Sequence, residues 1–145
     1  MAGKRIRVKA PATVSNLSCG FDVIGLALDE PYDMVDLELT DNGTVVIDDI
    51  RGCGTLSRDP EKNVVGAVLK AASAMAGSSA GFRISIDKGI RPGSGIGSSG
   101  ASAAAAAFGA NLLLGEKFTP AEMVRLAMEG ERLASGSAHA DNVAP

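Results

Sequence analysis

A glycine-rich loop between a strand pattern and an alanine-rich helix pattern constrains this 145-residue chain more than any other stretch. Phe82, Ile84 and Ile86 alternate with polar residues, which is the period of a strand with one buried face. Four glycines and three serines follow between residues 91 and 100, before an alanine run that predicts a helix. We therefore expect a strand, a glycine-rich loop and a helix start, in that order, over residues 82–114.

This arrangement predicts a phosphate site. The first N–H groups of a helix have no partners within the helix and carry a partial positive charge, so they attract an anion. Glycine lets the backbone close around the anion, and serine hydroxyls donate to phosphate oxygens or bind Mg2+. We interpret residues 91–101 as a nucleotide phosphate loop. The alternative that remains open is a Gly/Ser loop that only turns the chain into the helix.

Two familiar phosphate motifs fit poorly. The Walker A motif needs a lysine after its glycines, and no lysine occurs between Lys88 and Lys117. Gly95–Gly100 matches G-x-G-x-x-G, but the dinucleotide fingerprint also needs a later strand with an acidic residue about 20 positions on. The residues after Gly115 instead predict another helix. Neither a P-loop NTPase nor a dinucleotide-binding fold is expected.

The first half of the chain reads mostly as strands. Residues 5–9 alternate and predict a first strand, residues 10–22 read as a structured loop, and residues 23–28 resume the alternation. Residues 35–40 and 45–50 also alternate, and Asp41-Asn42-Gly43 between them is a turn signal. This pattern predicts an antiparallel hairpin.

Helix signals lie on both sides of the glycine-rich loop. Asp59-Pro60 resembles an N-cap followed by proline at the first helical position, with an apolar stripe that ends near Gly77. Thr119 to Glu122 forms a capping box that starts a last helix. On that helix Glu131 lies about 80° from Met123, at the margin of the apolar stripe. Its carboxylate can reach into a cleft from there, or it is a surface glutamate.

Other polar residues are candidates for binding. Asn16 and Asp22 could fix a small polar substrate, or they are ordinary turn residues. Asn63 and Val64 start a helix, where they could touch a purine, although Val64 could equally pack in the core. His139, the only histidine, lies in a small-residue segment with Asp141 and Asn142, and together they form a polar cluster in the sequence.

Composition excludes several classes of protein. A net charge of −3, 3% aromatic residues and no tryptophan do not suit nucleic-acid binding. The two cysteines lack metal-like spacing, no apolar run has membrane-spanning length, and no leader pattern is found, so we expect no membrane and a cytoplasmic location. A chain of this length is expected to form one domain with a core of its own.

Four segments together resemble the homoserine kinases of the threonine pathway, within the GHMP kinase superfamily. They are PATVSNLSCGFDVIGLALDEPYD at residues 11–33, KNVVG at 62–66, PGSGIGSSGASAA at 92–104 and GERLASGSAHADNVAP at 130–145. The resemblance implies an α+β fold: a GHMP kinase N-terminal domain, similar to the second domain of ribosomal protein S5, with a mixed sheet and helices on one face. It implies transfer of the γ-phosphoryl group of ATP to the side-chain hydroxyl of L-homoserine.

The resemblance also assigns residues to roles. The ATP phosphate loop comprises Arg91, Pro92, Gly93, Ser94, Gly95, Ile96, Gly97, Ser98, Ser99, Gly100 and Ala101. Asn63 and Val64 match the adenine-side contact, and Ser99 and Glu131 match the Mg2+ ligands. Asn16, Asp22, His139 and Asp141 match the residues that hold homoserine. Catalytic roles fall to Glu131, Asp141 and Asn142, where Asn142 stands at the place of an aspartate in the sugar and mevalonate kinases.

Three departures from the family pattern limit these expectations. Ile96 replaces a usual leucine, and Gly100 replaces an alanine at a cost of about 1 kcal/mol of helix propensity. The family is also about twice as long, and the resemblance implies that its second glycine-rich segment and the arginines that hold the substrate lie beyond Pro145. We therefore expect an N-terminal domain, inactive or nearly so alone. A homodimer, another GHMP small-molecule kinase and a non-catalytic module that binds nucleotide phosphate stay open.

Overall fold

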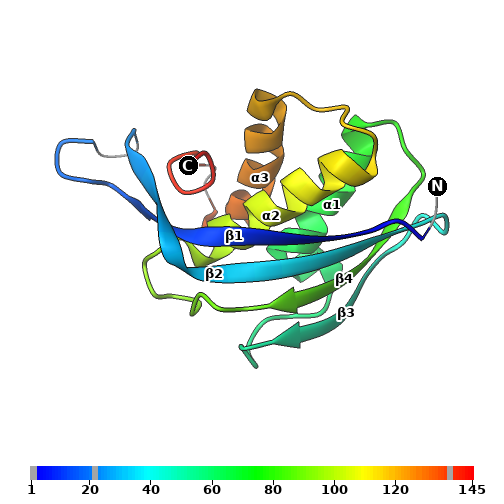
Figure 1. Cartoon of the computed structure of the whole chain (residues 1–145), viewed down its shortest axis with the longest axis horizontal. Helices are drawn as coiled ribbons and strands as arrows, with labels where there is room; N and C mark the ends of the chain where they lie inside the picture. Colours follow the sequence, from blue (N-terminus) through cyan, green and yellow to red (C-terminus); the bar gives the residue numbers. More distant parts are fainter. Residues whose placement is uncertain (1–2, 21–22, 137–138) are drawn as a thin grey trace.

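One four-stranded sheet with helices on a single face makes up the molecule (Figure 1). The computed structural model describes residues 3–20, 23–136 and 139–145. The strands are β1 (Arg5–Ser15), β2 (Gly25–Thr40), β3 (Val45–Arg51) and β4 (Gly81–Asp87), in the order β1-β2-β4-β3. β2 pairs antiparallel with β1 and β4, whereas β3 and β4 are parallel. The predicted α+β fold with a mixed sheet is confirmed.

The helices form two layers over the sheet. A 3-10 turn (Pro60–Lys62) leads into α1 (Val64–Met75), and α2 (Ser98–Leu113) and α3 (Pro120–Ser135) follow. α2 packs on β1 and β2 and α1 packs on β3, while α3 packs outside them on α1 and α2. Thr119 and Glu122 form the predicted capping box at the start of α3. None of the helices in the described ranges is long and apolar enough to cross a bilayer.

The predicted hairpin between residues 35–40 and 45–50 is wrong. β4 lies between β2 and β3, so that Phe82 is opposite Leu39 on one side and Val45 on the other. The Asp41-Asn42-Gly43 turn does reverse the chain, but the start of β4 lies between the two strands that the turn connects. The Phe82 N–H donates to the Thr44 carbonyl, just after the turn, at 2.8 Å. Only glycine fits at Gly81, because an added Cβ would collide with that carbonyl oxygen.

β1 is longer than the sequence pattern indicates, because residues 10–15, expected in a loop, continue the strand. Ala10 and Ala12 are buried, and α2 lies directly over this part of the sheet. Small side chains in the sequence are typical of a loop, but at Ala10 and Ala12 they let a helix approach the strand closely. β2 likewise runs from Gly25 without a break.

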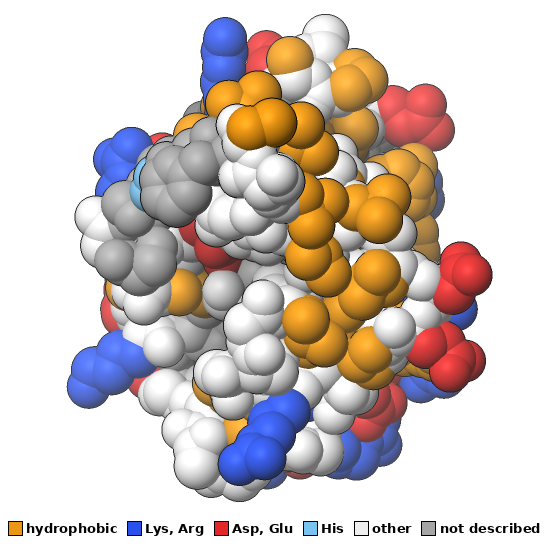
Figure 2. All heavy atoms as spheres, turned by 90° about the vertical axis from the view of Figure 1, so that its left-hand side faces the viewer, with side chains coloured by type: hydrophobic (Ala, Val, Ile, Leu, Met, Phe, Trp, Pro, Cys, Tyr) orange, Lys and Arg blue, Asp and Glu red, His pale blue; other side chains and the backbone are white. Residues whose placement is uncertain are grey.

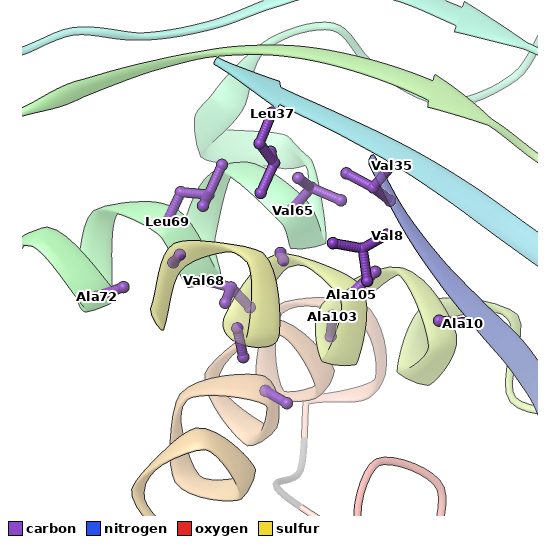
Figure 3. Close-up of a cluster of buried hydrophobic side chains, with 14 of the residues drawn as sticks. Val8, Ala10, Val35, Leu37, Val65, Val68, Leu69, Ala72, Ala103 and Ala105 are labelled. Atoms are coloured by element: carbon purple, nitrogen blue, oxygen red, sulfur yellow. The ribbon is translucent and has the colours of Figure 1, made fainter. Parts of the chain in front are cut away.

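The core lies between the sheet and the alanine-rich α2 (Figure 3). Val8, Val35 and Leu37 extend from the sheet toward α1 and α2, whose contributions include Val65, Val68, Leu69, Ala103 and Ala105. An added Cβ at Gly109 of α2 would meet Leu37 Cδ1 at 2.5 Å. α2 is therefore a thin central helix, as its alanine content predicts, and Gly97 of the glycine-rich loop is its N-cap.

Candidate functional site

The glycine-rich loop has the backbone that an anion site requires. Gly93, Gly95 and Gly97 have φ values of 75°, 79° and 66°, a region that residues with a Cβ seldom adopt. Gly97 is the N-cap of α2 and provides no side-chain hydrogen bond to the first turn. The N–H groups at the start of α2 therefore have no capping side chain from this position, and they remain available to an anion.

The loop is closed at its base. The Ser98 hydroxyl donates to the carbonyl of Ile90 at 2.9 Å, and the Lys88 ammonium group donates to the carbonyl of Ser98 at 2.9 Å. Ile90 and Ser98 are both buried. Residues 91–97 therefore extend from a neck where Lys88 and Ile90 meet Ser98.

A buried cluster that the sequence interpretation missed holds this neck. Asp33 on β2 forms an ion pair with Lys88 just after β4, and the side chains are 0% and 2% exposed. Ser102 of α2 donates to the Asp33 carboxylate at 2.8 Å and accepts from Lys88 at 3.0 Å, while the Ile90 N–H donates to Asp33 at 3.0 Å. Burial lowers the pKa of Lys88, and Asp33 opposes that change.

A cleft of about 480 Å3 opens beside the loop, which is a usual size for a small-molecule site. The predicted residues that line it come from four parts of the chain: Asn63, Val64, Pro92, Gly93, Gly95, Gly97, Ser98, Ser99, Glu131 and Asn142. Arg91, Ser94, Ile96, Gly100 and Ala101 belong to the loop or to α2 but do not line the cleft. The fold thus gathers the phosphate-loop, adenine-side and metal candidates around one space.

Ser99 and Glu131 present oxygen ligands to this cleft. Ser99 is half-buried in the first turn of α2, and Glu131 is buried on α3. A hydroxyl and a carboxylate fit Mg2+, which binds few protein oxygens and completes its shell with phosphate and water. No group of three His, Cys, Asp or Glu side chains with metal-site geometry is found within residues 3–20, 23–136 and 139–145.

Asn63 has a structural role. Its Oδ1 accepts from the Val65 N–H at 3.0 Å and caps α1, and its Nδ2 donates to the Ser57 carbonyl at 2.8 Å. Both ends of the side-chain amide are thus engaged within the protein. The side chain of Asn63 therefore caps α1, and both Asn63 and Val64 line the cleft.

The C-terminal residues lie at the end of the sheet where β1 ends and β2 begins. Ser15 pairs with Gly25, and an added Cβ at Gly25 would collide with the carbonyl oxygen of Asp141. Asn16, which has φ of 59°, is therefore at the same end of the sheet as Asp141.

The four predicted homoserine-binding residues differ in exposure. Asp141 is buried, and its Oδ1 has no hydrogen-bond partner among the residues that the structure describes. Asn16 and His139 are exposed. Asp22 lies outside the described residues.

Gly100 has a packing reason that the sequence did not reveal. An added Cβ there would lie 2.9 Å from the carbonyl oxygen of Asn142, so glycine lets the C-terminal segment rest against α2. Asn142 also lines a second, apolar groove of about 530 Å3 between β1, α2 and α3. Figure 2 shows the hydrophobic side chains of this end of the molecule gathered in a band. Asn142 therefore stands between the polar cleft and the apolar groove.

Comparison with known proteins identifies the family of the chain. The family described as GHMP kinases N terminal domain matches residues 63–145. The chain is 51% identical over 142 residues to a homoserine kinase of Haloarcula marismortui and 50% identical over 140 residues to one of Natronomonas pharaonis. Each alignment covers 97% of this chain and 46% of the relative, so the chain spans about half the length of the relatives that it matches.

Solved structures give the same result. A homoserine kinase from Cytophaga hutchinsonii superposes with a TM-score of 0.92 at 48% identity, over 97% of this chain and 45% of the other. A mevalonate kinase from Methanococcus jannaschii superposes with a TM-score of 0.76 at 15% identity, over 98% of this chain and 50% of the other, and shares the fold alone.

Proposed function

The chain belongs to the GHMP kinase family, and on that premise we propose that it carries the ATP site and part of the acceptor site of a homoserine kinase. The proposed reaction transfers the γ-phosphoryl group of ATP to the side-chain hydroxyl of L-homoserine and gives O-phospho-L-homoserine. The observation that carries the proposal is the cleft where the glycine-rich loop, the start of α1, Glu131 and Asn142 meet. The names of the relatives at 50–51% identity support the choice of acceptor.

The residues of the cleft suit phosphoryl transfer, which depends on positioning and charge stabilisation more than on covalent chemistry. Backbone N–H groups of residues 91–101 would hold the phosphates, and Asn63 and Val64 would contact the adenine side. Ser99 and Glu131 would hold Mg2+, which supplies positive charge to the phosphates when it is bound. Glu131, Asp141 and Asn142 are the proposed catalytic residues.

The acceptor would lie at the end of the sheet near the C-terminal residues. We assign homoserine binding to Asn16, Asp22, His139 and Asp141. The buried Oδ1 of Asp141 supports its part in this assignment, because a buried carboxylate oxygen is suited to accept from a cationic or hydroxyl donor. In a loose transition state the acceptor loses its proton late, so Asn142 would serve as a hydrogen-bonding group without acting as a base.

The domain arrangement is a further part of the proposal. We take residues 1–145 to be an N-terminal domain that has little or no activity alone, because the relatives are about twice as long. A cytoplasmic location fits Cys19 and Cys53, which are both free thiols. A homodimer stays a prediction. An intact mass of the natural protein well above 14.6 kDa would support the domain arrangement, and a mass of that value would contradict it.

Binding of Mg·ATP by the purified chain tests the site, with calorimetry as the readout. Glu131→Gln should weaken binding by roughly tenfold, equivalent to about 1.4 kcal/mol, because it removes a charged Mg2+ ligand. Glu129→Gln is the matched control, since Glu129 is exposed on the same helix and pairs with Arg132. Equal affinity of the wild-type chain and the Glu131→Gln variant would remove Glu131 from the metal site.

A phosphoryl-transfer assay on the natural protein separates the alternatives. L-homoserine should be the preferred acceptor in a panel that includes mevalonate and galactose. Preference for another alcohol would indicate a different GHMP kinase. Binding of Mg·ATP with no transfer to any acceptor would indicate a non-catalytic nucleotide-binding module.

A further inference from the structure

Thr13 occupies an irregular point of β1. Pro11 is opposite Tyr32 and Thr13 is opposite Ala27, so β2 advances five residues while β1 advances two. Alternation breaks here, because Ala12 is 0% and Thr13 only 5% exposed, although neighbours on a regular strand point to opposite faces. Irregularities of this kind redirect side chains and are frequent next to active sites.

The redirected residue contacts two separate parts of the candidate site. The Thr13 N–H donates to the carbonyl of Ile96, within the glycine-rich loop, at 3.1 Å. Its hydroxyl donates to Asn142 in the C-terminal segment, where the carbonyl oxygen lies at 3.0 Å and Oδ1 at 3.1 Å. An added Cβ at Gly97 would collide with the Thr13 hydroxyl, so the loop lies directly against this side chain.

The hydrogen bond from Thr13 fixes the orientation of the Asn142 side-chain amide. A side-chain amide has one end that accepts and one that donates, and the hydroxyl of Thr13 engages the accepting end. The NH2 group is then the end that Asn142 can offer to the cleft, which it lines. An NH2 donor suits an anionic phosphate oxygen, whereas a carbonyl oxygen in its place would repel one.

We propose that Thr13 is a positioning residue that fixes the place of Asn142 relative to the glycine-rich loop. The NH2 group of Asn142 then points toward the transferred phosphoryl group. The inference rests on the proposed function, because it assumes that a phosphate occupies the cleft. Thr13 itself lines the apolar groove and not the cleft, so it acts through Ile96 and Asn142.

The test uses the wild-type chain with Thr13→Val, Thr13→Ala and Thr13→Ser. Valine keeps the shape of threonine without the hydroxyl, alanine is a second hydroxyl-free variant in case valine disturbs folding, and serine keeps the donor. Thr44→Val is the matched control, because Thr44 also donates to an asparagine, Asn42, at 2.9 Å, in the turn at the other end of β2. Circular dichroism establishes which variants are folded.

NMR spectroscopy and calorimetry supply the two readouts. We expect the side-chain NH2 signals of Asn142 and the amide signal of Gly97 to shift when Mg·ATP is added to the wild-type chain. In the folded hydroxyl-free variants the Asn142 signals should start from a different position and cease to respond, and affinity should fall by roughly tenfold, equivalent to about 1.4 kcal/mol. Thr13→Ser and Thr44→Val should behave like the wild type.

Two results would overturn the positioning role. The first is a folded hydroxyl-free variant that binds Mg·ATP as the wild type does, with unchanged Asn142 signals. The second is a Thr13→Ser chain that resembles Thr13→Val. Absence of Mg·ATP binding by the wild-type chain would instead refute the proposal that this chain carries the ATP site. The nucleotide-free signals of Gly97 and Asn142 would still show whether Thr13 holds the two segments.

Discussion

The two faces of the sheet both carry acid–base pairs between strands, but burial makes the pairs physically different. On the helix-covered face Asp33 and Lys88 are 0% and 2% exposed. On the open face Asp48 and Arg83 are 36% and 54% exposed, and Arg7–Asp36 and Arg51–Asp87 are similar pairs. The buried pair has further hydrogen bonds to Ser102 and Ile90, whereas the side chains of the open-face pairs are 32–59% exposed.

The difference in burial decides how strongly a charge pair constrains the structure around it. A buried pair has lost its hydration, so the removal of one partner leaves the other charge without compensation. An exposed partner is solvated again by water when its mate is removed. The buried pair therefore determines how the glycine-rich loop is anchored, and the exposed pairs mainly keep the open face charged and hydrated.

Lys88→Met should produce the largest effect. It leaves the Asp33 carboxylate buried without its counter-ion, and we expect a loss of roughly 3–5 kcal/mol in the free energy of unfolding, measured by urea denaturation. Arg83→Met is the open-face counterpart and should lower the urea midpoint only slightly, because its partner Asp48 is exposed.

The double variant Lys88→Met/Asp33→Asn sharpens this prediction. It removes both buried charges, so it should be more stable than Lys88→Met alone. A Lys88→Met chain as stable as Arg83→Met would show that the buried pair is no more important than the exposed ones.

Ser102→Ala should have an intermediate effect. The change removes a buried hydroxyl that donates to Asp33 and accepts from Lys88, which should lower the free energy of unfolding by about 1–3 kcal/mol. Ser85→Ala, on β4 and pointing to the open face, is the control and should be close to neutral. Equal losses for the two serines would mean that the buried cluster tolerates a missing hydrogen bond.

Arg7→Met should have the smallest effect on the urea midpoint, and the pH dependence of that effect should identify its cause. The hydrogen bond from Arg7 lowers the pKa of Asp36 in the folded protein, so the pair stabilises the fold above the ordinary carboxyl pKa of 3.8. That contribution is lost as pH falls through the lowered folded value. Urea midpoints of wild type and Arg7→Met should differ slightly at pH 7 and low salt, and converge at pH 2 or at 1 M NaCl. A difference that persists at pH 2 would point to lost packing of the arginine stem.

Local signals in the sequence were sufficient for several elements. The alternation of Phe82, Ile84 and Ile86 predicted β4, the alanine run predicted a central α2, and Thr119 with Glu122 marked the start of α3. Strand pairing was not predictable in this way, because a turn signal reports only that the chain reverses. Whether another strand inserts depends on burial across the whole sheet, and Phe82 is wholly buried between β2 and β3.

Of the site residues predicted from the sequence, several from the glycine-rich loop line the same cleft as Glu131, and their binding roles stay predictions. The Asp33–Lys88 pair was missed although the sequence held a signal for it. Alternation along a strand places Asp33 on the same face as the buried Val35, two residues away. It likewise places Lys88 on the same face as the buried Ile86. Met34 pairs with Asp87, which places Asp33 opposite Lys88, but that register is known only when the β2–β4 pairing is known.

The central place of β4 has a consequence for synthesis of the chain on a ribosome. β1 and β2 are neighbours in both sequence and space, so they can pair before the rest of the chain exists. β3 is made next, but its partner in the sheet is β4, which follows only after α1. The sheet therefore cannot be completed until residue 87 has been made, and the nascent β3 has an unpaired edge for that interval.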